Sequence, residues 1–297
     1  MIHTSVLLQE VLAGLAIKPD DICLDGTING GGHSEAIAKY LSEAGTLIGL
    51  DLDGAALARA KKRLSKQNAN IILKQCSFRN LDTALAEERL PKVDKILLDL
   101  GLSSNQLDES GRGFTFRKEE PLTMTFNDTP DETTLTASKI VNTWDAENIE
   151  EIIRSYGEEQ YAKRIAKAIV EARTAKHIET TTDLTNIIEK AVPASYTHRR
   201  VNPATKTFQA LRITVNDEIG ALQDGLQRGF AHLAPGGRMA IISFHSLEDR
   251  IVKRFFKSKA EEGEANILTK RPQIPTEDEI ENNPRSRSAK LRIIEKL

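Results

Sequence analysis

The chain has 297 residues, of which 39% are hydrophobic and 28% are charged, and its formal net charge is −2. This length favours two domains or one elaborated domain, and the composition excludes a disordered chain, a collagen and a disulfide-rich mini-protein. The longest stretch without an acidic or basic residue has nine residues, whereas a membrane helix needs about 20. Residues 1–10 lack the pattern of a signal peptide. We therefore expect a cytoplasmic protein with no membrane contact.

The first hundred residues alternate strand and helix patterns. Four short apolar runs are predicted to be strands, at residues 21–25, 46–51, 70–74 and 93–99. Helical patterns at 34–43 and 54–66 follow the first two of them. Strands separated by helices of this length indicate βαβ units, a parallel sheet and helices on both of its faces.

The alternation stops at Gly101 and resumes about a hundred residues later. Residues 102–206 contain no convincing buried strand and have helical patterns at 146–156, at 158–174 and from 180 onward. The resumed pattern predicts one long helix at 207–233, a strand at 238–244, a basic helix at 247–257, and an antiparallel edge pair at 267–274 and 290–294. The sequence thus predicts an α/β sheet domain, residues 1–101 and 207–297, interrupted by a helical domain, residues 102–206.

A candidate cofactor site lies at the carboxyl ends of the predicted strands, where open α/β sheets bind their ligands. The first strand ends in Asp25, and a glycine-rich turn follows it up to His33. The second strand ends in Asp51, where a carboxylate can bind the two hydroxyls of a ribose. Phe78 follows the third strand and could pack on an adenine, or it could simply be a core residue. Asp99 ends the fourth strand.

The glycine turn indicates which nucleoside cofactor fits. A strict G-x-G-x-x-G pattern does not occur in it, which disfavours an NAD-dependent oxidoreductase. S-adenosylmethionine (SAM) has adenosine but no pyrophosphate, so a looser turn suffices. The residues therefore favour SAM, and we predict no metal site because the two cysteines, Cys23 and Cys76, cannot form one alone.

Several motifs resemble one bacterial family, the SAM-dependent methyltransferases that modify the exocyclic N4 of a cytidine in the decoding region of 16S ribosomal RNA. The similarity runs along almost the whole chain. It includes HTSVLLQEV at 3–11, DGT at 25–27, GGH at 31–33, DLGLSSNQ at 99–106, RGFTF at 112–116, PATKTFQALR at 203–212, SFHSLEDR at 243–250 and NPRSRSAKLR at 283–292. The phrase SFHSLEDR is long and specific.

The resemblance implies a fold, a cofactor and a substrate. The fold is a class I SAM-methyltransferase (Rossmann-like) sheet domain with an inserted all-helical domain, and the partner is 16S rRNA, within an assembled or nearly assembled small subunit. The oligomeric state, monomer or homodimer, stays open. Carried over residue by residue, the SAM contacts are Gly31, Gly32, His33, Asp51, Phe78, Asp99 and Gln106.

The chain departs from the family pattern at a few positions. Asn29 stands where the family usually has glycine, and asparagine tolerates left-handed geometry better than other side chains. Thr123 and Thr125 replace an acid and an arginine, and Asn202 and Lys206 replace a common histidine and arginine. These changes concern substrate binding or rate, so a non-catalytic RNA-binding factor is kept as an alternative.

Catalytic and RNA-contact residues are predicted with competing interpretations. Asp99 is a candidate acceptor for the proton of the amine, or it only binds SAM. His245 could contact the target base or a phosphate, or it is a structural loop residue, and Ser246 with Asp249 is predicted to cap the following helix. Phe114 and Phe116 could stack on the base or pack in a core. The candidate phosphate contacts are Arg112, Arg199, Arg200, Lys206, Arg250, Lys253 and Arg254.

Local charge supports a basic surface. Residues 154–212 contain 11 Lys and Arg residues against 6 acids, whereas residues 131–151 contain 6 acids against one lysine. The near-zero total therefore hides segments of opposite sign, which can also be no more than solvated helix faces.

Overall fold

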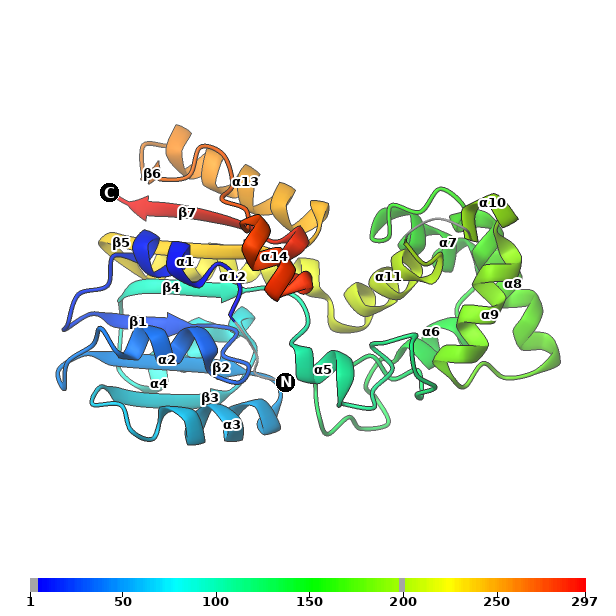
Figure 1. Cartoon of the computed structure of the whole chain (residues 1–297), viewed down its shortest axis with the longest axis horizontal. Coiled ribbons are helices and arrows are strands. Elements are labelled where there is room, and N and C mark those ends of the chain that lie inside the picture. Colours follow the sequence, from blue (N-terminus) through cyan, green and yellow to red (C-terminus); the bar gives the residue numbers. More distant parts are fainter. Residues whose placement is uncertain (1–4, 198–200) are drawn as a thin grey trace. The chain divides into compact units, whose positions relative to one another are not determined.

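The structure is a computed structural model that describes residues 5–197 and 201–297. The chain divides into two compact units, one formed by Met1–Gly101 with Ile219–Leu297 and the other by Leu102–Glu218. In Figure 1 the first unit combines the blue and cyan beginning of the chain with its yellow-to-red end. Both ends of the sequence therefore contribute strands to one sheet.

The first unit is built on a seven-stranded sheet in the order β3-β2-β1-β4-β5-β7-β6. Its strands are β1 (Ile22–Asp25), β2 (Thr46–Asp51), β3 (Asn70–Gln75), β4 (Val93–Asp99), β5 (Leu233–Ser243), β6 (Ala265–Ile267) and β7 (Lys290–Lys296). Strands β1 to β5 pair in parallel, and β7 pairs antiparallel with both β5 and β6. The predicted α/β fold class is confirmed, and an antiparallel pair does lie at the sheet edge. The predicted bounds of its first strand, 267–274, are wrong, because β6 covers only Ala265–Ile267.

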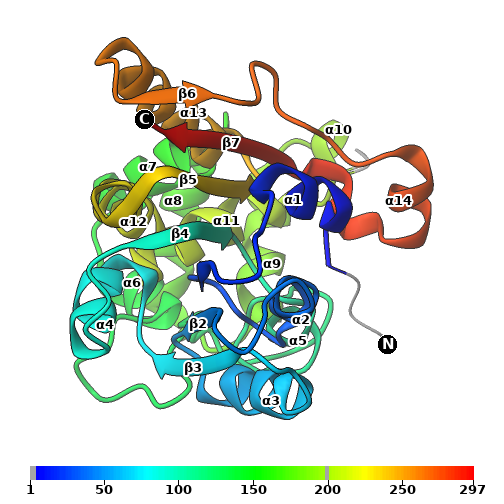
Figure 2. The ribbon, with the colours of Figure 1, turned by 90° about the vertical axis from the view of Figure 1, so that its left-hand side faces the viewer.

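Alternating apolar side chains on each strand give the sheet two buried faces. Cys23 and Leu47 belong to one core, whereas their neighbours Leu24 and Ile48 belong to the other, as the period of two in a strand requires. The first core is covered by α1 (Leu8–Leu15), α2 (Gly32–Ala38) and α3 (Gly54–Leu64). The second is covered by α4 (Leu81–Glu87), α12 (Glu218–His232) and α13 (Ser246–Glu261). Figure 2 shows these helices around the sheet.

Short elements complete the first unit. The 3₁₀ turn η1 (Phe78–Asn80) follows β3. Helix α14 (Glu277–Asn282) and the 3₁₀ turn η2 (Pro284–Ser288) lead from β6 to β7. No helix in the described residues combines the length and the hydropathy needed to cross a membrane.

The second unit consists of helices around its own apolar core. They are α5 (Ser104–Asp108), α6 (Ala137–Thr143), α7 (Ala146–Ser155), α8 (Ala162–Ala175), α9 (Thr181–Ala191), α10 (Ala194–Thr197) and α11 (Ala204–Asn216). Ile149, Ile152 and Ile153 on α7 pack with Ile165 and Ile169 on α8. Their spacing of three or four residues along each helix places them on one face, within the helical patterns predicted at 146–156 and 158–174.

The single helix predicted at 207–233 is wrong. Helix α11 ends at Asn216, and the C-cap residue Asp217 has the left-handed conformation with φ 45° and donates its N–H to the carbonyls of Ile213 and Thr214. Helix α12 begins directly afterwards. The second unit therefore extends to Glu218, past the predicted boundary at residue 206, and α11 belongs to it.

Candidate cofactor site and its surroundings

Three acids stand at the carboxyl ends of β1, β2 and β4, which pair side by side. Asp25 ends β1, is buried, and accepts a 2.6 Å hydrogen bond from the hydroxyl of Ser34 on α2. Burial raises the pKa of Asp25 above its usual value, and the hydrogen bond from Ser34 opposes this. This carboxylate ties the first strand to the helix that follows it.

Asp51 at the end of β2 organises the turns on both sides of it. Its Oδ2 accepts the N–H of Asn29 and its Oδ1 accepts the N–H of Asp53, both at 2.9 Å. Burial raises the pKa of Asp51 to about 6, against the effect of these two hydrogen bonds. Each carboxylate oxygen can accept a further hydrogen bond, so the geometry is compatible with the predicted contact to ribose hydroxyls.

The backbone of the glycine turn between β1 and α2 leaves little room for a side chain at Gly31. Gly31 has φ 77°, and a Cβ there would lie 3.2 Å from Ala60 Cα on α3. Asn29 adopts the left-handed conformation with φ 49°, as its tolerance for this region predicts. Arg63 on α3 donates a 3.1 Å hydrogen bond to the carbonyl of Gly30. The turn is thus held by α3 as well as by Asp51.

His33 connects this turn to Asp99 at the end of β4. Its Nε2 lies 2.9 Å from the carbonyl oxygen of Val6, and its Nδ1 lies 3.5 Å from Asp99 Oδ2. The N–H of Asp99 donates to Thr27 Oγ1 at 2.6 Å. Burial raises the pKa of Asp99 to about 6, even though the nearby His33 ring acts in the opposite direction. Asp99 Oδ1 is buried, and no donor among the described residues reaches it.

Phe78 lies beside the site but packs into the protein. It is the first residue of η1 and contacts the second core of the sheet unit. A Cβ on Gly225 of α12 would lie 2.6 Å from its ring atom Cδ2. The ring is half-buried, so core packing is its observed role, and a contact with adenine stays a prediction.

Gln106, the remaining predicted SAM contact, belongs to the second unit. Its Oε1 accepts the N–H of Ser103, and its own N–H donates to Ser103 Oγ. The two residues form a capping box at the start of α5. The side chain is buried and holds the turn that follows the fourth strand.

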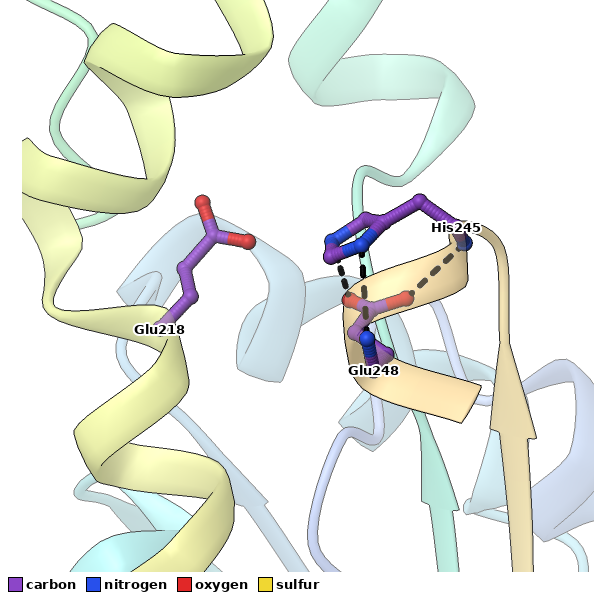
Figure 3. A group of neighbouring side chains, drawn as sticks. All are labelled: Glu218, His245 and Glu248. Carbon is purple, nitrogen blue, oxygen red and sulfur yellow. Dashed lines mark hydrogen bonds and ion pairs between the residues drawn. The ribbon is translucent and has the colours of Figure 1, made fainter. Parts of the chain in front are cut away.

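His245 caps helix α13. Its Nδ1 accepts the N–H of Glu248 at 3.4 Å, and Glu248 Oε2 accepts the N–H of His245 in return. The ring Nε2 lies 3.1 Å from Glu248 Oε1 (Figure 3). The predicted cap at Ser246 with Asp249 is therefore wrong by one residue, because the imidazole nitrogen of His245 serves as the acceptor.

Glu218, also drawn in Figure 3, binds Arg212 through both carboxylate oxygens in its own unit.

Three candidate RNA contacts have structural partners inside the second unit. Arg112 donates to the carbonyl of Phe126 at 2.8 Å, and its guanidinium lies 5.6 Å from the ring centroid of Phe114. Phe114 is buried and stacks on Phe126 at 5.7 Å. Phe116 packs edge-on against Phe208 at 5.4 Å. Core packing is thus the observed role of both phenylalanines.

The other predicted phosphate contacts differ in exposure. Arg250, Lys253 and Arg254 are exposed on α13, opposite its buried residues Val252 and Phe256. Lys206 donates to the carbonyl of Glu158 at 2.7 Å. Arg199 and Arg200 lie outside the described residues.

Sequence reasoning missed Arg63, Thr27 and Val6. Thr27 is part of the DGT motif, so a hydroxyl near the next strand could have been expected. Arg63 looks like any basic residue on a helix, and its contact with Gly30 follows only from the packing of α3. Val6 acts through its backbone, which leaves no signal in the side chain.

Comparison with known proteins agrees with this geometry. The model of the MraW methylase family matches residues 1–297. The chain belongs to the MraW methylase family. Proteins named ribosomal RNA small subunit methyltransferase H are similar over 99% of this chain, with 47% identity for those of Heliobacterium modesticaldum and Acetivibrio thermocellus and 43% for that of Clostridioides difficile. The alignments cover 98% of the first relative and 99% of the other two. The family expected from the motifs is thereby confirmed.

Proposed function

We propose that this protein transfers a methyl group from SAM to the exocyclic N4 of a cytidine in the decoding region of 16S rRNA, within the small ribosomal subunit. Membership of a methylase family and the names of the relatives support the reaction and the RNA substrate. The observation that carries the proposal is the free, buried Oδ1 of Asp99. A buried acceptor without a donor is costly, which is expected of a site whose donor arrives with the ligands.

The residues of the sheet unit fit SAM as the methyl donor. Its sulfonium and ammonium groups are cations, and Asp25, Asp51 and Asp99 supply three carboxylates at neighbouring strand ends. Gly31 allows the backbone to approach a ligand, because its positive φ and the nearness of α3 exclude a side chain. Gly31, Gly32, His33, Asp51, Phe78 and Asp99 of the sheet unit would hold the cofactor. Gln106 stays a contact that only the resemblance implies. Bound SAM supplies an electrophilic methyl group on sulfur.

Asp99 is proposed to accept a proton from the amine. The lone pair of a cytosine amino group is delocalised into the ring, so the nitrogen becomes nucleophilic only as it pyramidalises. Asp99 Oδ1 can accept an N–H and orient the nitrogen, and it takes one proton as the N–C bond forms and the S–C bond breaks. Its raised pKa of about 6 suits this task better than that of a solvated aspartate. For His245 we propose no step in the reaction, because its ring caps helix α13 and contacts Glu248.

The substrate contacts are proposed on charge and position. The helical unit, predicted as residues 102–206, recognises the RNA, and the exposed Arg250, Lys253 and Arg254 of α13 contact phosphates. The target base leaves its stack to reach the methyl group. These assignments imply a cytoplasmic enzyme that acts on ribosomal particles.

Methyl transfer to ribosomal particles tests the proposal directly. Small subunits from a strain that lacks this enzyme are incubated with the protein and tritiated SAM, and the modified nucleoside is identified by mass spectrometry. We expect label in N4-methylated cytidine and at least a hundredfold lower rate for Asp99→Asn, since a general base contributes about 10²–10⁴-fold. Binding of SAM and of subunits without transfer of label would instead indicate the non-catalytic RNA-binding factor.

A further inference from the structure

The segment Ser5–Leu7 lies against the glycine turn of the cofactor site, and we call it the strap. The carbonyl of Val6 accepts the Nε2–H of His33 at 2.9 Å. A Cβ on Gly32 would lie 2.3 Å from Ser5 Oγ, so the strap packs directly on the turn. All three strap residues are buried.

The strap follows a backbone path that leucine does not favour. Leu7 has φ 51° and ψ 37°, the left-handed conformation, at the N-cap position of α1. Such a conformation is costly for an L-residue with a large side chain. The Leu7 side chain provides no cap for the helix. Some other contact must therefore hold the strap in place.

Glu279 provides that contact from the far end of the chain. Its Oε1 accepts the N–H of Leu7 at 2.8 Å, across a separation of 272 residues. Glu279 lies in the first turn of α14, and its own N–H donates to Thr276 Oγ1, the cap of that helix. Figure 2 shows α14 beside α1. The carboxylate also stands next to the N-terminus of α1, where a negative charge is favourable.

The strap in turn fixes which nitrogen of His33 faces the reaction site. A ring nitrogen bound to a carbonyl oxygen must carry a proton, so Nε2–H is the donor to Val6, and Nδ1 is the nitrogen that lies 3.5 Å from Asp99 Oδ2. If the Val6 carbonyl moved, the ring would lose the contact that sets its orientation. Asp99 would then lose the neighbouring ring that lies against its Oδ2.

We propose that Glu279 is a positioning residue for the cofactor site, which acts by fixing the strap and, through Val6, the ring of His33. The acidic segment 277–281 is therefore more than a solvated helix. The inference rests on the proposed function only in taking SAM as the ligand.

Three variants test the inference in the full-length protein. Glu279→Ala removes the acceptor, Glu279→Gln keeps an amide oxygen that accepts the same N–H, and Glu281→Ala removes an exposed charge from the same helix. SAM affinity is measured by calorimetry, kcat and KM by methyl transfer, and exchange of the Leu7 amide by hydrogen exchange. We expect Glu279→Ala to raise the Kd and KM for SAM about fivefold to tenfold, less than the loss of a hydrogen bond made to the ligand itself, because Glu279 acts only through the strap and His33. We also expect it to speed exchange at Leu7. Glu279→Gln restores most of the affinity, and Glu281→Ala equals the wild type.

A wild-type affinity for SAM in Glu279→Ala overturns the inference. It is also overturned if Glu281→Ala or Glu279→Gln loses as much SAM affinity as Glu279→Ala. If Glu279→Ala does not fold at the assay temperature, Glu279→Asp replaces it, because its carboxylate is one methylene too short to reach Leu7. A wild-type protein that does not bind SAM contradicts the proposed function. Equal affinities in proteins that do bind SAM contradict only the role of Glu279.

Discussion

Asp51 and Asp99 differ in how their oxygens are occupied, although both end strands of one sheet. Asp51 accepts one backbone N–H on each oxygen and so shapes the glycine turn. Asp99 has one oxygen near His33 and one without a donor among the described residues. Asp51 therefore holds the turn, and we propose that it also binds a ribose, whereas we propose that Asp99 receives a group that arrives with the ligands.

Substitutions at Asp51 test whether its carboxylate contributes to SAM binding. We expect Asp51→Ala to raise the Kd for SAM roughly tenfold to a hundredfold, because it removes hydrogen bonds from a charged acceptor and releases the N–H of Asn29. Asp51→Asn, which keeps one acceptor oxygen, should lie between this variant and the wild type. Glu43→Ala, at an exposed position, is the control. Calorimetry gives the affinities, and an unchanged Kd for Asp51→Ala would refute the ribose assignment.

The raised pKa values predict how SAM affinity depends on pH. Burial places the pKa of both Asp51 and Asp99 at about 6, so both are ionised at pH 8 and become protonated as the pH falls through 6. Protonation removes negative charge that attracts the cationic cofactor. The Kd for SAM should therefore rise as the pH is lowered from 7 to 5 and stay level from 7 to 8. Asp99→Asn should make the pH dependence less steep, because Asp51 still titrates in this variant. A Kd of the wild type that does not change over this range would contradict the prediction.

At the scale of elements, the sequence predicts best where the periodicity of apolar residues is strong. The parallel strands and the placement of acids at their ends follow from alternation and from the topology of an open sheet. The break between α11 and α12 is not predictable in this way, because apolar residues continue on both sides, at Leu211 and Leu222, and a single left-handed residue ends the helix. The cap at His245 was missed because imidazole is an uncommon acceptor at that position.

A substitution at Asp217 distinguishes the break from a continuous helix. In a continuous helix, Asp217→Ala would stabilise the protein, because alanine has the highest helix propensity. At φ 45° alanine is strained, so we expect Asp217→Ala to lower the free energy of unfolding by about 1 kcal/mol. Asp217→Gly, which loses the same carboxylate without the strain, is the matched control and should be less destabilising. Chemical denaturation measures both, and a more stable Asp217→Ala protein would contradict the observed break.

At the scale of the whole molecule, the two units differ in charge. The acids at the strand ends belong to the sheet unit, whereas the basic segment 154–212 belongs to the helical unit. The net charge of −2 therefore says little about the partner. A protein of this kind can lose affinity for RNA without losing affinity for its cofactor.

The adjacent Arg199 and Arg200 allow a test of that separation. We expect the double variant Arg199→Ala, Arg200→Ala to bind small subunits about tenfold more weakly. In a plot of the logarithm of the binding constant against the logarithm of the salt concentration, its slope should be smaller in magnitude by about two, as for two lost phosphate contacts. Its Kd for SAM should equal that of the wild type. Filter binding across a salt series and calorimetry measure the two affinities. An equal loss of both would indicate misfolding and contradict the assignment.

The discontinuous sheet also sets an order for synthesis on the ribosome. Strands β1 to β4 are made first, but the parallel neighbour of β4 and the antiparallel pair at that edge come only after the entire helical unit. At about 5–20 residues per second, the ribosome needs roughly 6–23 s to make the helical unit. During this time β4 has an unpaired edge, and the helical unit, which is continuous in sequence, can already fold. The nascent chain is therefore expected to acquire its helical unit before its sheet, and to expose the edge of β4 to chaperones in the meantime.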